Sequence, residues 1–177
     1  MTGSHDDFTT LSLHIPATHV QDQKLSTESL LVTFLTPERM PRDTRLNDKV
    51  WTCQHCQECS NPERTFTFDA VPDTLIIHFK RWTWNSLPRG TPARAALLRQ
   101  AIEPSGLITL NDAQYNLVAC VYYKGDASQG HYVTIALHDA QWWLYNDGCM
   151  PLKCAAPKAE LQHNGLFMSY LCVYAKS

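Results

Sequence analysis

The sequence predicts an α+β fold that is mostly antiparallel β with few helices. Many apolar segments are short and alternate apolar with polar residues, as the strands of a half-buried sheet do. The turns between the C-terminal segments are too short for the crossovers that parallel strands need. The 177 residues, 44% of them hydrophobic, have the length and composition of a single domain, 1–177, and no long polar linker divides them.

The first elements expected are a strand and a helix. Residues 8–15 partly alternate apolar with polar side chains, which predicts a strand. Ser26 or Thr27 can cap the N-terminus of a helix that ends before Pro37. The apolar residues that recur at helical spacing within it are Leu30, Leu31, Phe34 and Leu35. Beyond it, residues 50–68 combine a cysteine cluster, a turn and an alternating segment, which is typical of a hairpin with a metal-binding knuckle.

The remaining elements are predicted to be mainly strands. The apolar run at 74–79 suits a strand that is buried on both faces. Residues 82–106 contain several prolines and glycines and show no clear pattern, apart from one helical turn expected over 93–98. Alternating segments predict further strands at 115–123, 131–137, 141–145 and 167–174.

Composition argues against several classes of protein. The net charge is −2 and the acidic and basic residues are interspersed, so a nucleic-acid binder is not indicated. No apolar run approaches the roughly 20 residues that a membrane span needs, and no secretory signal is recognised. The cysteines number seven, which is odd, and Cys53, Cys56 and Cys59 crowd together. That usage favours a reducing compartment, the cytoplasm or the nucleus, over a disulfide framework.

The segment Gly130-His131-Tyr132 is the strongest candidate for chemistry. His131 opens a predicted strand, and Asn146-Asp147 ends the next one, so a short antiparallel turn would bring the pair level with the imidazole. We expect an amide or carboxylate there to hold Nδ1–H and to leave Nε2 free as a base. A lone histidine near a strand end is more often an ordinary surface residue, so this spacing alone does not establish a catalytic role for His131.

Four segments, in order, resemble the ubiquitin-specific proteases. They are Thr74–Arg81, Leu107–Asn111, the stretch from Tyr115 to Asp147 with its Gly-His-Tyr, and Tyr170–Tyr174. The resemblance covers roughly residues 8–177 and implies the papain-like cysteine protease fold. Residues 8–70 would form the fingers-like region, and residues 71–177 the palm that carries the histidine.

The resemblance also implies roles for five residues. His131 matches the catalytic general base, Asn146 the third member of the triad, and Asp147 an adjacent acid that assists. Gly130 and Tyr132 match residues that flank the channel for the C-terminal Gly-Gly of ubiquitin. The implied partner is ubiquitin or a ubiquitin-like protein, and catalysis of this type requires no cofactor.

The nucleophile is not recognised in the sequence. The family places its cysteine in a Gly-Asn-x-Cys-Tyr type of motif at a helix N-terminus, and none of the seven cysteines has that context. Three explanations stay open. The chain is a fragment of a longer protease, an inactive module that binds ubiquitin or acts as a scaffold, or one part of an enzyme whose second chain supplies the missing half.

The pair Cys53-x-x-Cys56 has zinc-knuckle spacing. Structural zinc normally takes two such pairs, and the second pair that the family would supply is not recognised here. A structural zinc ion at Cys53 and Cys56 and a metal-free knuckle with reduced thiols both remain open. A zinc-ribbon module that binds nucleic acid has only this pair in its favour, and the slightly negative net charge of the chain argues against it.

Overall fold

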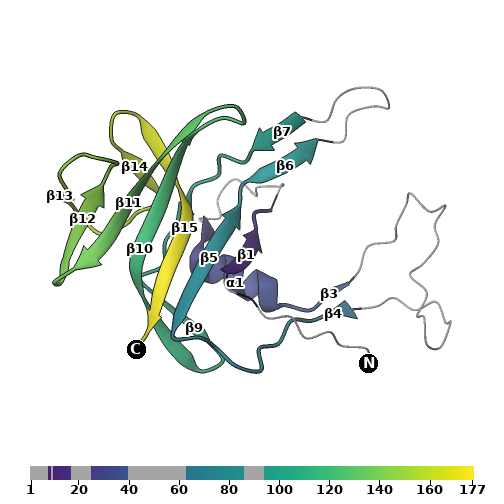
Figure 1. The fold of residues 1–177 in the computed structure, drawn as a ribbon. Helices are drawn as coiled ribbons and strands as arrows, with labels where there is room; N and C mark the ends of the chain where they lie inside the picture. The colour runs from purple at the N-terminus through teal and green to yellow at the C-terminus, as the bar shows by residue number, and fades with distance from the viewer. Residues whose placement is uncertain (1–7, 9, 17–24, 40–62, 86–93) are drawn as a thin grey trace.

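The computed structural model describes residues 8, 10–16, 25–39, 63–85 and 94–177 (Figure 1). Within these ranges, a nine-stranded sheet runs in the order β1, β5, β15, β10, β11, β12 and β13, with β14 added to β15 and β9 added to β10. The one helix of the described residues, α1, packs against one face of the sheet.

The strands differ widely in length. Those of the nine-stranded sheet are β1 (Thr10–His14), β5 (Thr74–Lys80), β9 (Leu107–Leu110), β10 (Ala113–Gly125), β11 (Gly130–His138), β12 (Gln141–Tyr145), β13 (Leu152–Lys153), β14 (Glu160–Gln162) and β15 (Leu166–Lys176). Three two-stranded sheets pair β2 (Leu25–Ser26) with β8 (Ile102–Glu103), β3 (Glu38–Arg39) with β4 (Glu63–Arg64), and β6 (Trp82–Asn85) with β7 (Arg94–Leu97). The helix α1 spans Thr27–Leu35.

Most of these strands pair antiparallel, as the sequence predicts. The exceptions among the described residues are β1 with β5 and β2 with β8, which are parallel. The strands predicted at 115–123, 131–137, 141–145 and 167–174 are confirmed as β10, β11, β12 and β15. The helix cap is confirmed as well, because the Ser26 hydroxyl accepts a hydrogen bond from the Ser29 backbone N–H at 3.1 Å.

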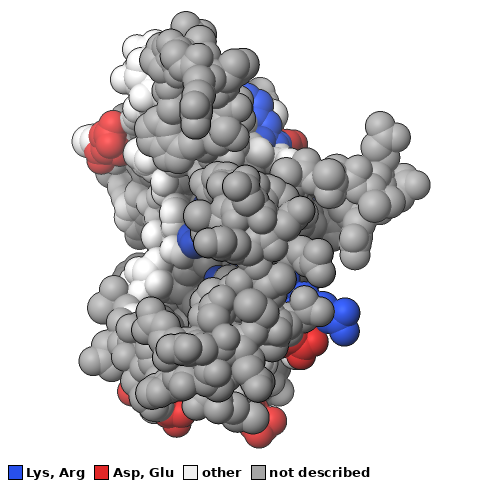
Figure 2. Space-filling view, turned by 90° about the vertical axis from the view of Figure 1, so that its right-hand side faces the viewer, with Lys and Arg blue, Asp and Glu red and all other residues white. Residues whose placement is uncertain are grey.

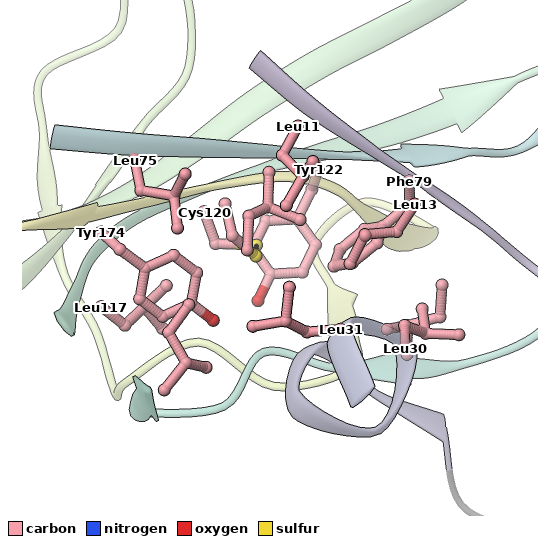
Figure 3. Packing of buried hydrophobic residues seen from close by; sticks show 14 of the residues in the cluster. Leu11, Leu13, Leu30, Leu31, Leu75, Phe79, Leu117, Cys120, Tyr122 and Tyr174 are labelled. Carbon is pink, nitrogen blue, oxygen red and sulfur yellow. Dashed lines mark hydrogen bonds between the residues drawn. The ribbon is translucent and has the colours of Figure 1, made fainter. Parts of the chain in front are cut away.

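The core lies between the sheet and α1 (Figure 3). Leu30 and Leu31 point from the helix toward side chains of the central strands, and both are 2% exposed. The sheet residues that surround them in Figure 3 include Leu13, Leu75, Phe79, Cys120, Tyr122 and Tyr174. Because buried apolar side chains stabilise a fold in proportion to the area they remove from water, this cluster is the main source of stability.

Three core tyrosines also bind the loops that border the sheet. Tyr115 donates its hydroxyl hydrogen to the Pro72 carbonyl at 2.6 Å, and Tyr174 donates to the Ser105 carbonyl at 2.9 Å. Tyr122 donates to the Lys158 carbonyl and accepts from the Lys158 N–H. A buried phenol needs such a partner, so each tyrosine fixes a loop as well as filling the core.

A fully buried arginine links three segments of the chain through hydrogen bonds to backbone carbonyls. Arg81 follows β5, and its Nε donates to the Ser169 carbonyl at 2.6 Å. Its Nη1 donates to the carbonyls of Leu98 and Gln100 at 3.0 Å and 2.9 Å. Desolvation lowers the pKa of Arg81 to about 10. The guanidinium therefore joins β5, β15 and the segment between β7 and β8.

Three local predictions are wrong. The helical turn predicted over 93–98 is the strand β7, because pairing of Ala95 and Ala96 with β6 overrides the helix propensity of alanine. The alternating segment 65–68 forms no strand; instead its phenylalanines pack, with Phe66 stacked on Phe34 at 4.4 Å between ring centroids. β5 buries one face completely, while His78 on its other face is only half-buried.

Figure 2 shows how the charged side chains of the described residues are distributed on one face of the molecule. On the face in Figure 2, the lysine, arginine and acidic residues that are described lie scattered, and neither sign forms a continuous patch among them. No helix within the described ranges is long and apolar enough to cross a bilayer.

We expect Arg81→Met to lower the free energy of unfolding by about 3 kcal/mol or more, because it removes the donor from one buried and two partly buried carbonyls. Arg39→Met is the matched control, since the Arg39 side chain is 82% exposed and pairs with Glu63 only at the surface. Its effect should stay within about 0.5 kcal/mol. Urea unfolding followed by circular dichroism measures both, and equal midpoints would contradict the role of Arg81.

Candidate active site

The structure brings His131 and Asn146 together where β11 begins and β12 ends. His131 lies near the start of β11, opposite Lys124 on β10, and Asn146 follows β12 directly. Pairing of Thr134 with Tyr145 sets the register of the two strands. As a result, Asn146 Oδ1 lies 2.7 Å from His131 Nε2, which confirms the predicted proximity.

The nitrogen that Asn146 contacts differs from the prediction. We expected the partner at Nδ1 and a free Nε2, whereas the contact is to Nε2. An amide oxygen only accepts, so Nε2 carries the proton in the neutral ring and Nδ1 keeps its lone pair. The nitrogen available as a base is therefore Nδ1.

Asp147 lies near the same ring but is held differently. Its Oδ2 is 3.7 Å from His131 Nδ1, and its side chain is 77% exposed. The backbone at Asp147 has φ 44°, in a turn closed by the Cys149 N–H donating to the Asn146 carbonyl at 3.0 Å. An exposed carboxylate at this distance contributes little through charge alone. Asn146, rather than Asp147, is the group that orients the imidazole.

A second histidine at the site was not predicted. His163 Nε2 lies 3.4 Å from Asn146 Nδ2, on the side of the amide away from His131. It sits in the loop between β14 and β15 and belongs to no motif that the sequence analysis recognised. The contact depends on how that hairpin folds toward β12, so the pattern of residues alone does not reveal it.

An open depression of about 500 Å³ surrounds these side chains. The residues that line it are Lys124, Gly125, Gln129, Gly130, His131, Asn146, His163, Asn164 and Phe167. A half-buried imidazole at the wall of such a depression is accessible to a reacting group, which is the arrangement that general base catalysis requires.

No cysteine of the described ranges lines this depression. Cys120 and Cys172 are fully buried in the core, with their sulfur atoms 3.9 Å apart. Burial raises the pKa of the Cys120 thiol and that of Cys154. Cys149 is exposed in the turn after Asn146. A raised thiol pKa opposes nucleophilic character, so neither Cys120 nor Cys154 resembles a catalytic thiol.

Gly130 is required by a neighbouring ring. A Cβ at this position would overlap the ring of Tyr123, which lies directly against the Gly130 backbone. The absence of a side chain at Gly130 therefore makes room for Tyr123. The Tyr123 hydroxyl in turn donates to the Asp126 carbonyl at 2.7 Å, and Asp126 accepts from the Ser128 N–H. The bonds that the Asp126 carboxylate accepts, chiefly from Ser128, lower the pKa of Asp126 and keep the turn between β10 and β11 compact.

A second depression, of about 350 Å³, lies on the other side of this turn. Its walls include Trp82, Tyr123, Gly130 and Tyr132, so Gly130 borders both depressions. Tyr132 is 47% exposed, and its ring lies 4.8 Å from that of Tyr123 between centroids. The two depressions and their aromatic wall form a continuous surface around the start of β11.

The predicted metal pair cannot be placed. Cys53 and Cys56 lie outside the described residues. Within the described ranges, no three or more histidine, cysteine or acidic side chains gather as they would around a metal ion.

Comparison with known proteins points to one family. The family model described as ubiquitin carboxyl-terminal hydrolase matches residues 43–165, which is more than half of the chain. The chain is 25% identical to ubiquitin carboxyl-terminal hydrolase 3 of Mus musculus, over 80% of this chain and 29% of that protein. It is 24% identical to ubiquitin carboxyl-terminal hydrolase 10 of Saccharomyces cerevisiae, over 71% of this chain and 16% of that protein. The chain thus spans less than a third of the length of these relatives.

Solved structures share the fold. The yeast SAGA DUBm with an Sgf73 mutant matches with a TM-score of 0.69 and 21% identity, over 96% of this chain and 35% of that chain. A SAGA DUB module bound to monoubiquitin matches with a TM-score of 0.66 and 21% identity, over 96% of this chain and 35% of that chain. The similarity confirms the predicted papain-like fold of the ubiquitin-specific proteases.

We expect Gly130→Ala to destabilise the protein by about 1–3 kcal/mol, because the new Cβ displaces the Tyr123 ring. The aromatic contacts around Tyr123 should be disturbed as well, which near-ultraviolet circular dichroism measures. Gly106→Ala is the control, since a Cβ there meets nothing within 4 Å, and it should change stability by less than about 0.5 kcal/mol. Identical behaviour of the two variants would refute the contact.

Proposed function

We propose that this chain, which belongs to the ubiquitin carboxyl-terminal hydrolase family, carries the general base of a thiol-dependent deubiquitinase. The observation that carries the proposal is the 2.7 Å contact between His131 Nε2 and Asn146 Oδ1, at the wall of an open depression. That contact fixes the imidazole with the lone pair of Nδ1 available. The proposed substrate is an isopeptide or peptide bond at the C-terminus of ubiquitin.

The proposed reaction needs three protein groups. His131 Nδ1 takes the proton of a cysteine thiol, and Asn146 stabilises the resulting imidazolium through its bond to Nε2. The thiolate attacks the carbonyl carbon of the isopeptide bond, and the imidazolium returns the proton to the departing lysine amine. Water then hydrolyses the thioester, with Nδ1 as base again. Asp147 is proposed to assist only weakly, because its carboxylate is exposed and lies 3.7 Å from Nδ1.

The ubiquitin tail is proposed to lie across the turn between β10 and β11. Gly130 borders both depressions, so an extended Gly-Gly segment that runs from one depression to the other passes over its backbone. The exposed ring of Tyr132 forms one wall of this path. In keeping with this proposal, the similar SAGA DUB module binds monoubiquitin.

The thiol has to come from outside the depression that the described residues form. A further stretch of polypeptide or a second protein chain would supply it. The chain spans 29% of its mouse relative, so the activity of the whole relative is carried to this chain only as a proposal. A reducing compartment, the cytoplasm or the nucleus, fits both the chemistry and the free cysteines among the described residues.

The second candidate function is a ubiquitin-binding or scaffold module without catalysis. The observation in its favour is that no described cysteine lines the depression around His131. Both candidates require ubiquitin binding, and they differ in whether a thiol ever reaches His131.

We expect the chain to bind ubiquitin, and Tyr132→Ala to weaken binding about tenfold or more in isothermal titration calorimetry. Leu137→Ala is the matched control, because Leu137 is 40% exposed at the far end of the same strand. Unchanged affinity in Tyr132→Ala, or no binding by the wild-type chain, would remove the proposed path for the tail.

A ubiquitin probe with a C-terminal electrophile separates the two candidate functions. We expect no covalent adduct with the chain alone, and an adduct at the supplied thiol when the missing half is present. His131→Ala should then slow adduct formation by about 100-fold or more, because the thiol loses its base. Labelling of a cysteine within this chain would contradict the proposed origin of the thiol, and equal labelling of His131→Ala would leave only the binding module.

A zinc ion at Cys53 and Cys56 is separable from this reaction, which uses only protein groups. We therefore expect a chelator to leave the affinity for ubiquitin at the depression unchanged. Elemental analysis that finds about one zinc ion per chain, lost in Cys53→Ser, would identify a structural site. Absence of zinc at that level would establish a metal-free knuckle.

A further inference from the structure

We propose that His163 is a positioning residue for His131, which acts through the side chain of Asn146. The inference deepens the proposed function and rests on it, since it assigns how the base acquires its reactive form. It starts from a line of three half-buried side chains. His131 Nε2 lies 2.7 Å from Asn146 Oδ1, and Asn146 Nδ2 lies 3.4 Å from His163 Nε2.

The donor and acceptor roles of the Asn146 amide decide which nitrogen of each imidazole carries the proton. An amide nitrogen carries two hydrogens and only donates, so His163 Nε2 must accept and its proton must sit on Nδ1. The amide oxygen only accepts, so His131 Nε2 must donate. Each imidazole is thereby assigned one tautomer, and the two tautomers are opposite: Nε2–H in His131 and Nδ1–H in His163.

The amide needs this second partner because its two ends have nearly the same shape. Rotation of Asn146 by half a turn would present Nδ2 to His131 in place of Oδ1. His131 Nε2 would then have to accept, its proton would move to Nδ1, and the lone pair needed to deprotonate a thiol would be lost. With the His163 proton on Nδ1, its Nε2 accepts from Asn146 Nδ2, which stabilises the productive orientation of the amide relative to the rotated one.

The loop that carries His163 is itself anchored. Lys124 Nζ donates to the Asn164 carbonyl at 2.7 Å and lies 5.6 Å from the centroid of the Phe167 ring. The His163 N–H donates to the Gly165 carbonyl at 2.9 Å, and Gly165 has φ 119°. A Cβ at Gly165 would overlap Lys124 Nζ, so the loop lies tightly against β10. The position of His163 is thus set by the Lys124 side chain and by a hydrogen bond within the loop, neither of which involves Asn146.

The wild-type chain provides a test that needs no substitution. At a pH high enough for both rings to be neutral, long-range proton–nitrogen correlation spectra report which ring nitrogen carries the proton. We expect Nε2–H for His131 and Nδ1–H for His163. An Nε2–H tautomer at His163 would overturn the inference, because that nitrogen could not accept from Asn146.

Two substitutions at His163 test whether it acts on His131. His163→Leu keeps a side chain of similar breadth without an acceptor, and the ratio of Nε2–H to Nδ1–H in His131 should fall about fivefold. His163→Gln restores an acceptor and should recover most of the wild-type ratio. His138→Leu is the matched control, an exposed histidine at the other end of β11, and should leave the ratio unchanged.

The outcomes separate this inference from the proposed function. An unchanged His131 ratio in a folded His163→Leu, or no recovery in His163→Gln, overturns the positioning role. If His163→Leu does not fold, the wild-type tautomers and the His163→Gln ratio decide. Ubiquitin binding is measured on the same samples: its absence in the wild type removes the proposed function, whereas the tautomers report on His163 regardless of binding.

Discussion

The pairing of β10 with β15 is the constraint on which the rest of the described structure depends. The two longest strands lie side by side at the centre of the sheet, with Cys120 opposite Cys172 (Figure 1). β9 and β11 attach to the free side of β10, while β5 and β14 attach to the free side of β15. Every strand of the sheet therefore takes its register, directly or through one or two neighbours, from this pair.

Successive residues of β10 link stability with the site. Tyr122 faces α1 and is fully buried, and Tyr123 faces the opposite side, where it meets Gly130. The register of β10 shifts between Val121 and Tyr122, and such an irregularity alters the local twist of a strand. Because neighbouring residues of a strand point to opposite faces, one strand both completes the core and shapes the wall beside His131.

Local pattern in the sequence predicts a large part of this arrangement. The capped helix at Ser26, the long C-terminal strands and the proximity of Asn146 to His131 all come from periodicity, turn length and family resemblance. The strand at Ala95 and Ala96 was not predicted, because its pairing with β6 competes with an intrinsic helix preference.

Details that depend on contacts between distant segments were not predictable. Sequence spacing indicates that Asn146 lies near His131 but does not tell which ring nitrogen it reaches, since that depends on the orientation of the ring. His163 lies 17 residues beyond Asn146, in a loop whose position is set by Lys124 from another strand. The burial of Arg81 likewise depends on carbonyl groups from β15 and from the segment before β8.

The contact between Tyr123 and Gly130 has a consequence for how such a site changes during evolution. Any residue with a Cβ at position 130 meets the Tyr123 ring, so it becomes tolerable only after that ring has been replaced. Replacement of Tyr123 first removes the hydroxyl that bonds to Asp126 and loosens the turn beside His131. The effect of a substitution at one of these positions therefore depends on the residue at the other. A lineage that replaces the glycine must pass through a less stable intermediate or change both residues together.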